Sequence, residues 1–211
     1  MKIGFVLECA PEGPDEQVFK MLVKRLKEQN FIGDVECIPK CQSNKANLMK
    51  DIVGVVGNLQ VVDRCDHVFV IWDQNPSWTV RPKKISDSAQ IRQVEELLRS
   101  EELLNEAVTL ICLKYELESW LISDERAFGQ LRYGQGTPSA KSPRRETKPK
   151  DAASVMKQEI GLDIYKDYID AKVLATHIEF SKLAKIPTFC QWFCKLQKLS
   201  PTGTQAPFCK C

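Results

Sequence analysis

The sequence predicts an α/β fold: a small parallel β-sheet with helices on both faces, followed by C-terminal helices. Two observations support this prediction. Four short apolar runs lack the polar alternation of a half-exposed strand and are too short to form helices. Between them lie segments whose apolar residues recur every three or four positions, as in amphipathic helices. Apolar strands joined by such helices are typical of a parallel sheet that is buried on both faces.

The strands are expected at residues 3–9, 35–38, 67–72 and 107–113. The first is followed by Pro11, Gly13 and Pro14, which interrupt regular structure, and Pro39 is expected to end the second. The third is the most strand-like stretch of the chain and runs straight into Asp73. Each strand therefore has a defined end at which polar residues begin.

Helical spacing marks the segments between the strands. The apolar residues that define it are Val18, Leu22 and Leu26 in the first helix, Leu48, Ile52, Val55, Val56 and Leu59 in the second, and Ile91, Val94 and Leu98 in the third. The third helix is expected to be capped near Ser86 or Asp87. Further helices are expected at 152–160, 164–174 and 188–199.

The chain is expected to divide into an α/β core at residues 1–132, a flexible basic loop at 133–150, a helical region packed on the core at 151–199, and a tail at 200–211. Glycines and prolines interrupt the loop, and its basic residues outnumber its acidic ones. The basic residues considered for binding are Arg144, Arg145, Lys148 and Lys150. We interpret the loop either as a solvated linker or as a contact for a phosphate backbone.

Composition excludes few classes of protein. The 211 residues are 43% hydrophobic and 27% charged, which is ordinary for a globular protein, and the net charge of +2 is too small to name a partner. The longest apolar run is far shorter than the roughly 20 residues of a membrane span. The N-terminal segment is interpreted as a strand rather than a signal peptide. We therefore expect a soluble cytoplasmic protein without membrane contact.

The nine cysteines are expected to be mostly reduced thiols. Three close pairs occur in the sequence, and they are Cys37 with Cys41, Cys190 with Cys194, and Cys209 with Cys211. A structural zinc site usually has four ligands in two tight, regularly spaced pairs, whereas the spacing here is irregular. We therefore interpret the cysteines as small apolar core residues and as part of a frayed tail, rather than as ligands of a zinc site.

Acidic and amide side chains follow several of the predicted strands. Glu8 lies at the end of the first strand, Asp73 and Asn75 follow the third, and Glu116 and Glu118 follow the fourth. Functional residues of parallel sheets gather beyond the carboxyl ends of the strands. Mg²⁺ is bound in proteins by a few oxygen ligands and keeps several waters. The sequence therefore predicts a divalent metal site, for Mg²⁺ or Mn²⁺, at this edge of the sheet.

Other residues and motifs have simpler explanations. Glu12, Asp15 and Glu16 lie at a helix start, where acids complement the helix dipole. The chain has neither a Gly-rich Walker loop nor a Gly-x-Ser-x-Gly elbow. The two histidines, His67 and His177, are far apart in sequence, and we expect surface or packing roles for them.

Three segments carry a family resemblance: residues 2–15, 70–78 and 116–124. They resemble an uncharacterised bacterial TOPRIM-like family, domain of unknown function 4276. The Glu-Leu-Glu-Ser-Trp block at 116–120 is the most specific of these matches, and Lys148-Pro149-Lys150 fits as well. The resemblance covers most of residues 1–199.

The resemblance implies a TOPRIM-like fold, shared by topoisomerases, primases and a group of defence nucleases. Its motif has a Glu after the first strand and an Asp-x-Asp after a later one. Glu8 would take the first role, as metal ligand or general acid/base, and Asp73 would begin the second motif. Asn75 departs from the pattern because it replaces the second aspartate with an uncharged ligand. Glu116 and Glu118 would compensate as further ligands.

Two classes of function follow from the resemblance. One is a nuclease that uses Mg²⁺ or Mn²⁺ to cleave DNA or RNA, as the effector of a bacterial defence or toxin system. The other is a non-catalytic TOPRIM-like subunit that binds an ATPase partner or nucleic acid. The lack of charge on Asn75 favours the second class, and the other acids at the strand ends favour the first. The nuclease is the preferred hypothesis.

Overall fold

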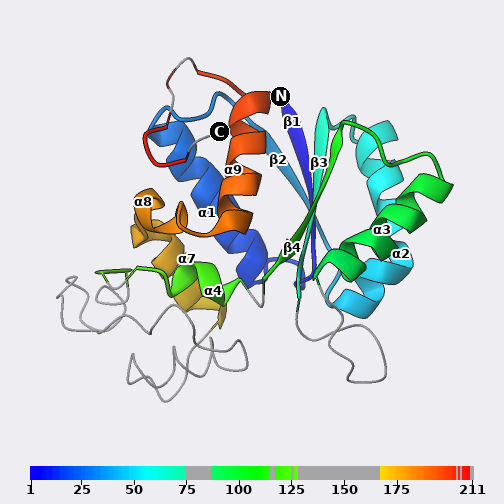
Figure 1. Cartoon of the computed structure of the whole chain (residues 1–211), viewed down its shortest axis with the longest axis horizontal. Helices are drawn as coiled ribbons and strands as arrows, with labels where there is room; N and C mark the ends of the chain where they lie inside the picture. Colours follow the sequence, from blue (N-terminus) through cyan, green and yellow to red (C-terminus); the bar gives the residue numbers. More distant parts are fainter. Residues whose placement is uncertain are drawn as a thin grey trace. The chain divides into compact units, whose positions relative to one another are not determined.

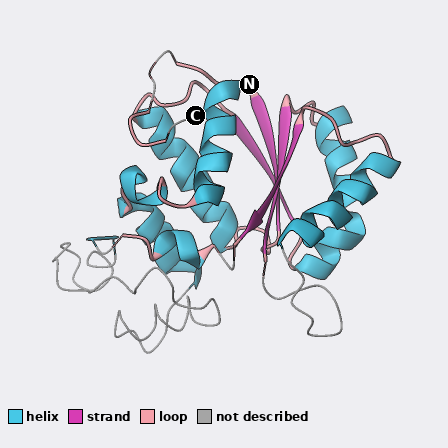
Figure 2. Cartoon of the chain, viewed as in Figure 1, coloured by secondary structure: helices cyan, strands magenta, loops and turns pink. Residues whose placement is uncertain are grey.

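Four parallel strands form the sheet of this computed structural model, in the order β2-β1-β3-β4. The strands are β1 (Lys2–Leu7), β2 (Glu36–Cys41), β3 (His67–Asp73) and β4 (Val108–Leu113). The structure describes residues 1–74, 87–114, 117–124, 126–127, 167–202, 204 and 206–209. These residues confirm the predicted α/β fold with a small parallel sheet and C-terminal helices (Figures 1 and 2).

The chain divides into two compact units. The first contains Met1–Glu16 and Asp34–Lys114, and therefore the whole sheet; the second contains Gln17–Gly33 and Tyr115–Cys211. In the part of the chain that the structure describes, no helix combines the length and apolar character needed to cross a membrane.

One face of the sheet is covered by two helices of the first unit, α2 (Lys45–Val61) and α3 (Asp87–Ser100), as Figure 1 shows. The helices bury the apolar stripes that the sequence predicted. Their core includes Leu48, Ile52, Val56, Leu59, Val94 and Leu98, packed with Val6, Val68, Val70 and Trp72 of the strands. Residues of the opposite face are buried as well, and Phe5 and Phe69 stack there with ring centroids 5.6 Å apart. The sheet is therefore buried on both faces, as its uninterrupted apolar strands require.

The prediction that Pro39 ends the second strand is wrong. Pro39 lies inside β2 and is paired with Phe5 of β1. A proline lacks the N–H that a central strand needs to bond a neighbour on each side. Since β2 is an edge strand, it pairs with β1 alone and tolerates the missing donor.

The helices of the second unit surround a cluster of aromatic rings. They are α1 (Pro14–Glu28, from Gln17 onward), α4 (Glu118–Leu121), α7 (Asp167–His177), α8 (Phe180–Leu183) and α9 (Pro187–Leu199). The Trp120 ring lies 5.6 Å from Phe19 and 5.4 Å from Phe189, between centroids. Its indole N–H donates a hydrogen bond of 3.0 Å to Thr188 Oγ1. Trp120 is 1% exposed and therefore anchors the core of this unit.

The predicted C-terminal helices are partly within the described residues. The segment expected at 188–199 is α9. Within the described residues the one expected at 164–174 is found as α7, which ends at His177, three residues later than expected. The helix expected at 152–160 lies outside the described residues. The tail is not frayed where it is described: Phe208 contacts the rings of Phe31 and Phe193, each at 5.0 Å between centroids.

Gly4 is expected to be required for the contact between β1 and α2. A Cβ at this position would lie 2.9 Å from Cδ1 of the fully buried Leu59. The Gly4→Ala substitution should therefore lower the free energy of unfolding by about 1–3 kcal/mol, as overpacking does. Gly54→Ala is the control, because a Cβ at that position in α2 meets nothing within 4 Å. It should raise the free energy of unfolding by about 0.5–1 kcal/mol. Urea unfolding measures both, and equal effects would contradict the contact.

Trp120→Ala should lower the free energy of unfolding by about 3–5 kcal/mol, because it empties a large buried site. Val61→Ala is a suitable control, since Val61 is 73% exposed and its truncation should change stability by less than about 0.5 kcal/mol. Chemical denaturation of the two variants tests the difference. If the Trp120→Ala and Val61→Ala proteins were equally stable, the conclusion that Trp120 is part of the core would be wrong.

Candidate functional site

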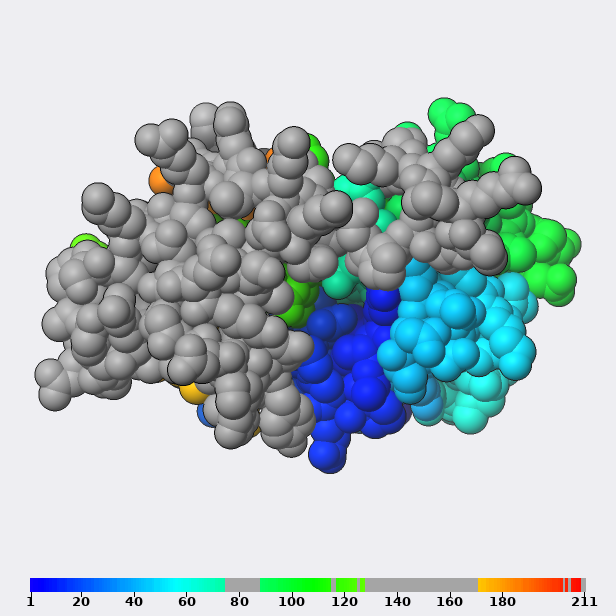
Figure 3. All heavy atoms as spheres, turned by 90° about the horizontal axis from the view of Figure 1, so that it is seen from below, coloured from blue at the N-terminus to red at the C-terminus, as the bar shows by residue number. Residues whose placement is uncertain are grey.

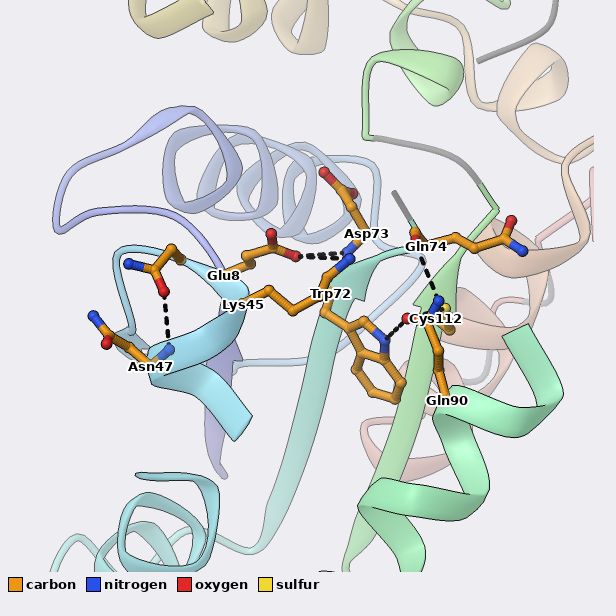
Figure 4. A network of polar contacts seen from close by, with 9 residues as sticks. Glu8, Lys45, Asn47, Trp72, Asp73, Gln74, Gln90 and Cys112 are labelled. Carbon is orange, nitrogen blue, oxygen red and sulfur yellow. Dashed lines mark hydrogen bonds and ion pairs between the residues drawn. The ribbon is translucent and has the colours of Figure 1, made fainter. Parts of the chain in front are cut away.

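The carboxyl ends of β1 and β3 bring Glu8 and Asp73 together. The two strands are paired in parallel, with Leu7 opposite Ile71, so their ends meet at one edge of the sheet. Glu8 Oε2 accepts a hydrogen bond of 3.1 Å from the backbone N–H of Asp73. Figure 4 shows the Glu8 carboxylate directed toward the Asp73 backbone. Glu8 and Asp73 therefore lie at the same edge of the sheet, while their role as metal ligands stays a prediction.

A lysine that the sequence analysis did not consider lies beside Glu8. Lys45 Nζ is 3.9 Å from Glu8 Oε2, and the two side chains are only 5% and 16% exposed. Lys45 is the first residue of α2, which Asn44 caps by accepting a hydrogen bond of 2.9 Å from the N–H of Asn47. In Figure 3, blue atoms of the N-terminal residues border the cyan atoms of α2.

The start of α2 carried a sequence signal that points to Lys45. The first turn of a helix ordinarily favours acidic residues, because the N-terminal end of the dipole is positive. The first turn of α2 has no acid and begins instead with Lys45. Such a start is unfavourable for the helix alone, and in the structure the Glu8 carboxylate lies 3.9 Å from Lys45 Nζ.

The end of β3 is held by a buried glutamine of α3. Gln90 is fully buried; its side-chain carbonyl accepts a hydrogen bond of 3.2 Å from the Trp72 indole N–H. Its amide donates a bond of 3.0 Å to the backbone carbonyl of Gln74. Gln90 thus contacts the residues on both sides of Asp73, as Figure 4 shows. These bonds fix the strand end from which the Asp73 side chain projects.

One of the other predicted ligands is described and belongs to the second unit, and the rest lie outside the described residues. Asn75 and Glu116 lie outside them, and so do the basic residues Arg144, Arg145, Lys148 and Lys150. Glu118 is the first residue of α4, which belongs to the second unit, and its part in a metal site stays a prediction. Within the described ranges, no three His, Cys, Asp or Glu side chains are placed to hold a metal ion.

The acids of the loop after β1 have local partners. Glu16 is 5% exposed and accepts hydrogen bonds from the N–H of Glu12, at 2.7 Å, and from the Cys41 thiol, at 3.1 Å. Glu12 itself adopts a positive φ of 60°. The carboxylate of Glu16 therefore stabilises a tight loop, which agrees with a structural interpretation of this acidic segment.

Two thiols lie next to this loop. Cys9 follows Glu8 directly, and its Sγ is 3.7 Å from the Sγ of Cys41 at the end of β2. The hydrogen bond with Cys41 lowers the pKa of the Cys9 thiol, although burial opposes this shift. The same hydrogen bond, burial and the Glu16 carboxylate raise the pKa of Cys41. Cys41, Glu12 and Glu16 also line a pocket of about 390 Å³.

The histidine nearest the sheet has a packing role. His67 begins β3, at the opposite end of the strand from Asp73, and is 1% exposed. Its Nε2 lies 2.9 Å from Thr109 Oγ1, and its ring packs against Phe69 with centroids 4.9 Å apart. Of the surface and packing roles expected for the histidines, His67 therefore has the packing role.

Asp124 is also structural. It is 1% exposed and accepts hydrogen bonds from the N–H groups of Arg126, at 3.0 Å, and Glu179, at 2.8 Å.

The structure defines an α/β protein with a four-stranded parallel sheet. Two acidic residues, Glu8 and Asp73, lie at the carboxyl ends of its two central strands, where the Glu8 carboxylate contacts the Asp73 backbone. Residues 12–197 match a family described as "Domain of unknown function (DUF4276)", and the chain belongs to this family. Glu8 precedes the matched segment. No curated protein and no solved structure matches the chain.

The buried Glu8–Lys45 pair should be coupled more strongly than an exposed pair. We expect a double-mutant cycle of Glu8→Gln and Lys45→Met to give a coupling energy of about 0.5–3 kcal/mol. The control cycle uses Glu28→Gln and Lys24→Met on α1, whose atoms are 3.7 Å apart but whose side chains are 58% and 66% exposed. Exposed pairs of this kind contribute only about 0.3–0.5 kcal/mol. Unfolding free energies measure both cycles, and equal couplings would contradict the predicted difference.

Proposed function

We propose that this protein is a TOPRIM-like, metal-dependent nuclease that cleaves phosphodiester bonds in DNA or RNA. The observation that carries the proposal is the contact of Glu8 Oε2 with the backbone N–H of Asp73, at 3.1 Å. It puts the two acids of the proposed motif side by side, although they are far apart in sequence.

The donor set suits Mg²⁺ or Mn²⁺. Mg²⁺ is commonly bound through one or two carboxylates and retains several waters, so Glu8 and Asp73 suffice as protein anchors. Asn75, Glu116 and Glu118 are the further ligands that we propose. When bound, the metal orients a water and offsets the charge on the phosphate. Glu8 would hold the ion or accept a proton from the attacking water.

The basic segment supplies the proposed substrate contact. Arg144, Arg145, Lys148 and Lys150 would bind phosphates of the nucleic acid backbone, since such contacts position a substrate without reading its sequence. Lys45, at 3.9 Å from Glu8, reduces the repulsion between carboxylates when no metal is bound. A cytoplasmic effector of a bacterial defence or toxin system, acting with an ATPase partner, fits this chemistry.

The second candidate is a non-catalytic subunit that binds an ATPase or nucleic acid. One observation favours it: Lys45 lies where its ammonium group competes with a metal ion for Glu8. Asn75 adds to this argument because it contributes no charge to the motif. Competition from Lys45 and the missing charge at Asn75 would both lower the affinity for a metal ion, and neither would disturb the fold.

Cleavage assays on plasmid, single-stranded DNA and tRNA, with Mg²⁺, Mn²⁺ or EDTA, test the nuclease. The wild-type protein should cleave at least one substrate with Mn²⁺, and Asp73→Asn should reduce cleavage to the EDTA level. The control is Asp51→Asn, an exposed acid on α2, which should leave cleavage unchanged. Asn75→Asp should strengthen metal binding, because it restores a charge to the motif.

Activity that survives Asp73→Asn would contradict the proposed site. A wild-type protein that is inert with every substrate and metal, alone and with an ATPase partner, would favour the binding subunit. In that case, replacing Arg144, Arg145, Lys148 and Lys150 should weaken nucleic acid binding and flatten its salt dependence.

A further inference from the structure

We propose that Cys9 and Cys41 are a site of reversible oxidative modification, at which a peroxide converts the two thiols into a disulfide. The two residues are 32 positions apart in sequence, yet their Sγ atoms lie 3.7 Å apart. Both are free cysteines of intermediate exposure. By comparison, Cys65 and Cys112, which also belong to the sheet and its core, are buried.

The backbone already holds the pair in position for a cross-link. Cys41 is the last residue of β2 and is paired with Leu7 of β1, two residues before Cys9. The carbonyl of Cys9 accepts a hydrogen bond of 2.8 Å from the N–H of Ser43, just beyond β2. Because a disulfide is about 2.05 Å long, the sulfur atoms need to approach by only about 1.7 Å. Rotation of the two side chains can supply a shift of this size.

A small oxidant can reach Cys41 through the pocket of about 390 Å³ that this residue lines with Glu12 and Glu16. A molecule of hydrogen peroxide is far smaller than this volume. The pocket is lined by the loop after β1, the end of β2 and two residues of α2, and of the two cysteines it is Cys41 that lines it. The sulfur of Cys9 lies 3.7 Å from that of Cys41.

The reaction balances with hydrogen peroxide as the oxidant. One thiol attacks a peroxide oxygen, the O–O bond breaks, and a sulfenic acid and one water are formed. The second thiol then attacks the sulfenic sulfur, so that the S–S bond forms and a second water leaves. The two sulfur atoms lose two electrons in total, and peroxide is reduced to two waters. A dithiol reductant reverses the change by thiol–disulfide exchange.

The cross-link changes the loop that contains Glu8. It replaces the hydrogen bond from the Cys41 thiol to Glu16, and it ties the residue directly after Glu8 to the end of β2. If Glu8 is a metal ligand, its freedom to approach an ion falls. This consequence rests on the proposed function, whereas formation of the disulfide does not.

Peptide mapping tests the modification on the full-length protein. Trypsin separates Cys9, Cys37 and Cys41 into peptides 3–20, 28–40 and 41–45. After treatment with hydrogen peroxide and alkylation of the remaining thiols, mass spectrometry should find 3–20 joined to 41–45. Dithiothreitol should separate them. Cys41→Ser should abolish the linked species, and Cys37→Ser, a half-buried cysteine on the same strand, should leave it unchanged. Recovery of Cys9 and Cys41 on separate peptides from the oxidised wild-type protein would overturn the proposal.

Titration calorimetry with Mn²⁺ tests the consequence separately. Oxidation should weaken Mn²⁺ binding by at least about threefold in the wild-type protein, a change of roughly 0.7 kcal/mol, and should have no effect in Cys41→Ser. Equal affinity of the reduced and oxidised wild-type proteins would overturn the link to Glu8. Absence of Mn²⁺ binding in both forms, together with a mapped disulfide, would overturn the proposed metal site and leave the modification site standing.

Discussion

The pairing of β1 with both β2 and β3 is the constraint on which the candidate sites depend. The register that puts Leu7 opposite Ile71 on one side and Cys41 on the other brings three strand ends to one edge of the sheet. Glu8 can then accept a hydrogen bond from the Asp73 backbone, and Cys9 can approach Cys41. A shift of one residue in either pairing would turn these side chains to the other face. Both candidate sites therefore follow from the same strand register.

The largely buried charges of Glu8 and Lys45 at this edge are costly for the stability of the fold. Removing a lysine and a glutamate from water is costly, and their attraction offsets that cost only when the geometry is favourable. At 3.9 Å, the Lys45–Glu8 pair is a loose contact, and Lys45 also opposes the dipole of α2. An apolar pair would satisfy the fold more simply. The retention of two charges at a strand end is consistent with a site that exchanges one cation, the ammonium, for another.

Much of the fold could be predicted from the sequence because burial leaves a strong periodic signal. The apolar strand that ends at Asp73 and the helical stripe through Leu48 and Leu59 were recognisable from spacing alone. The proximity of Glu8 to Asp73 followed from the rule that parallel strand ends share an edge. Pro39 was misjudged because strand order, which the sequence does not reveal, makes β2 an edge strand. Lys45 and Gln90 were missed because a polar side chain acquires its buried partner only when distant elements pack together.

The central claim is that Glu8 and Asp73 hold one divalent ion, and a crystal structure of the protein soaked in Mn²⁺ tests it most directly. The account predicts an anomalous difference peak at the ends of β1 and β3, about 2.1 Å from carboxylate oxygens of both residues. Lys45 Nζ should then lie further from Glu8 Oε2 than 3.9 Å. A map without a peak at this edge, with the ammonium group still beside Glu8, would contradict the account.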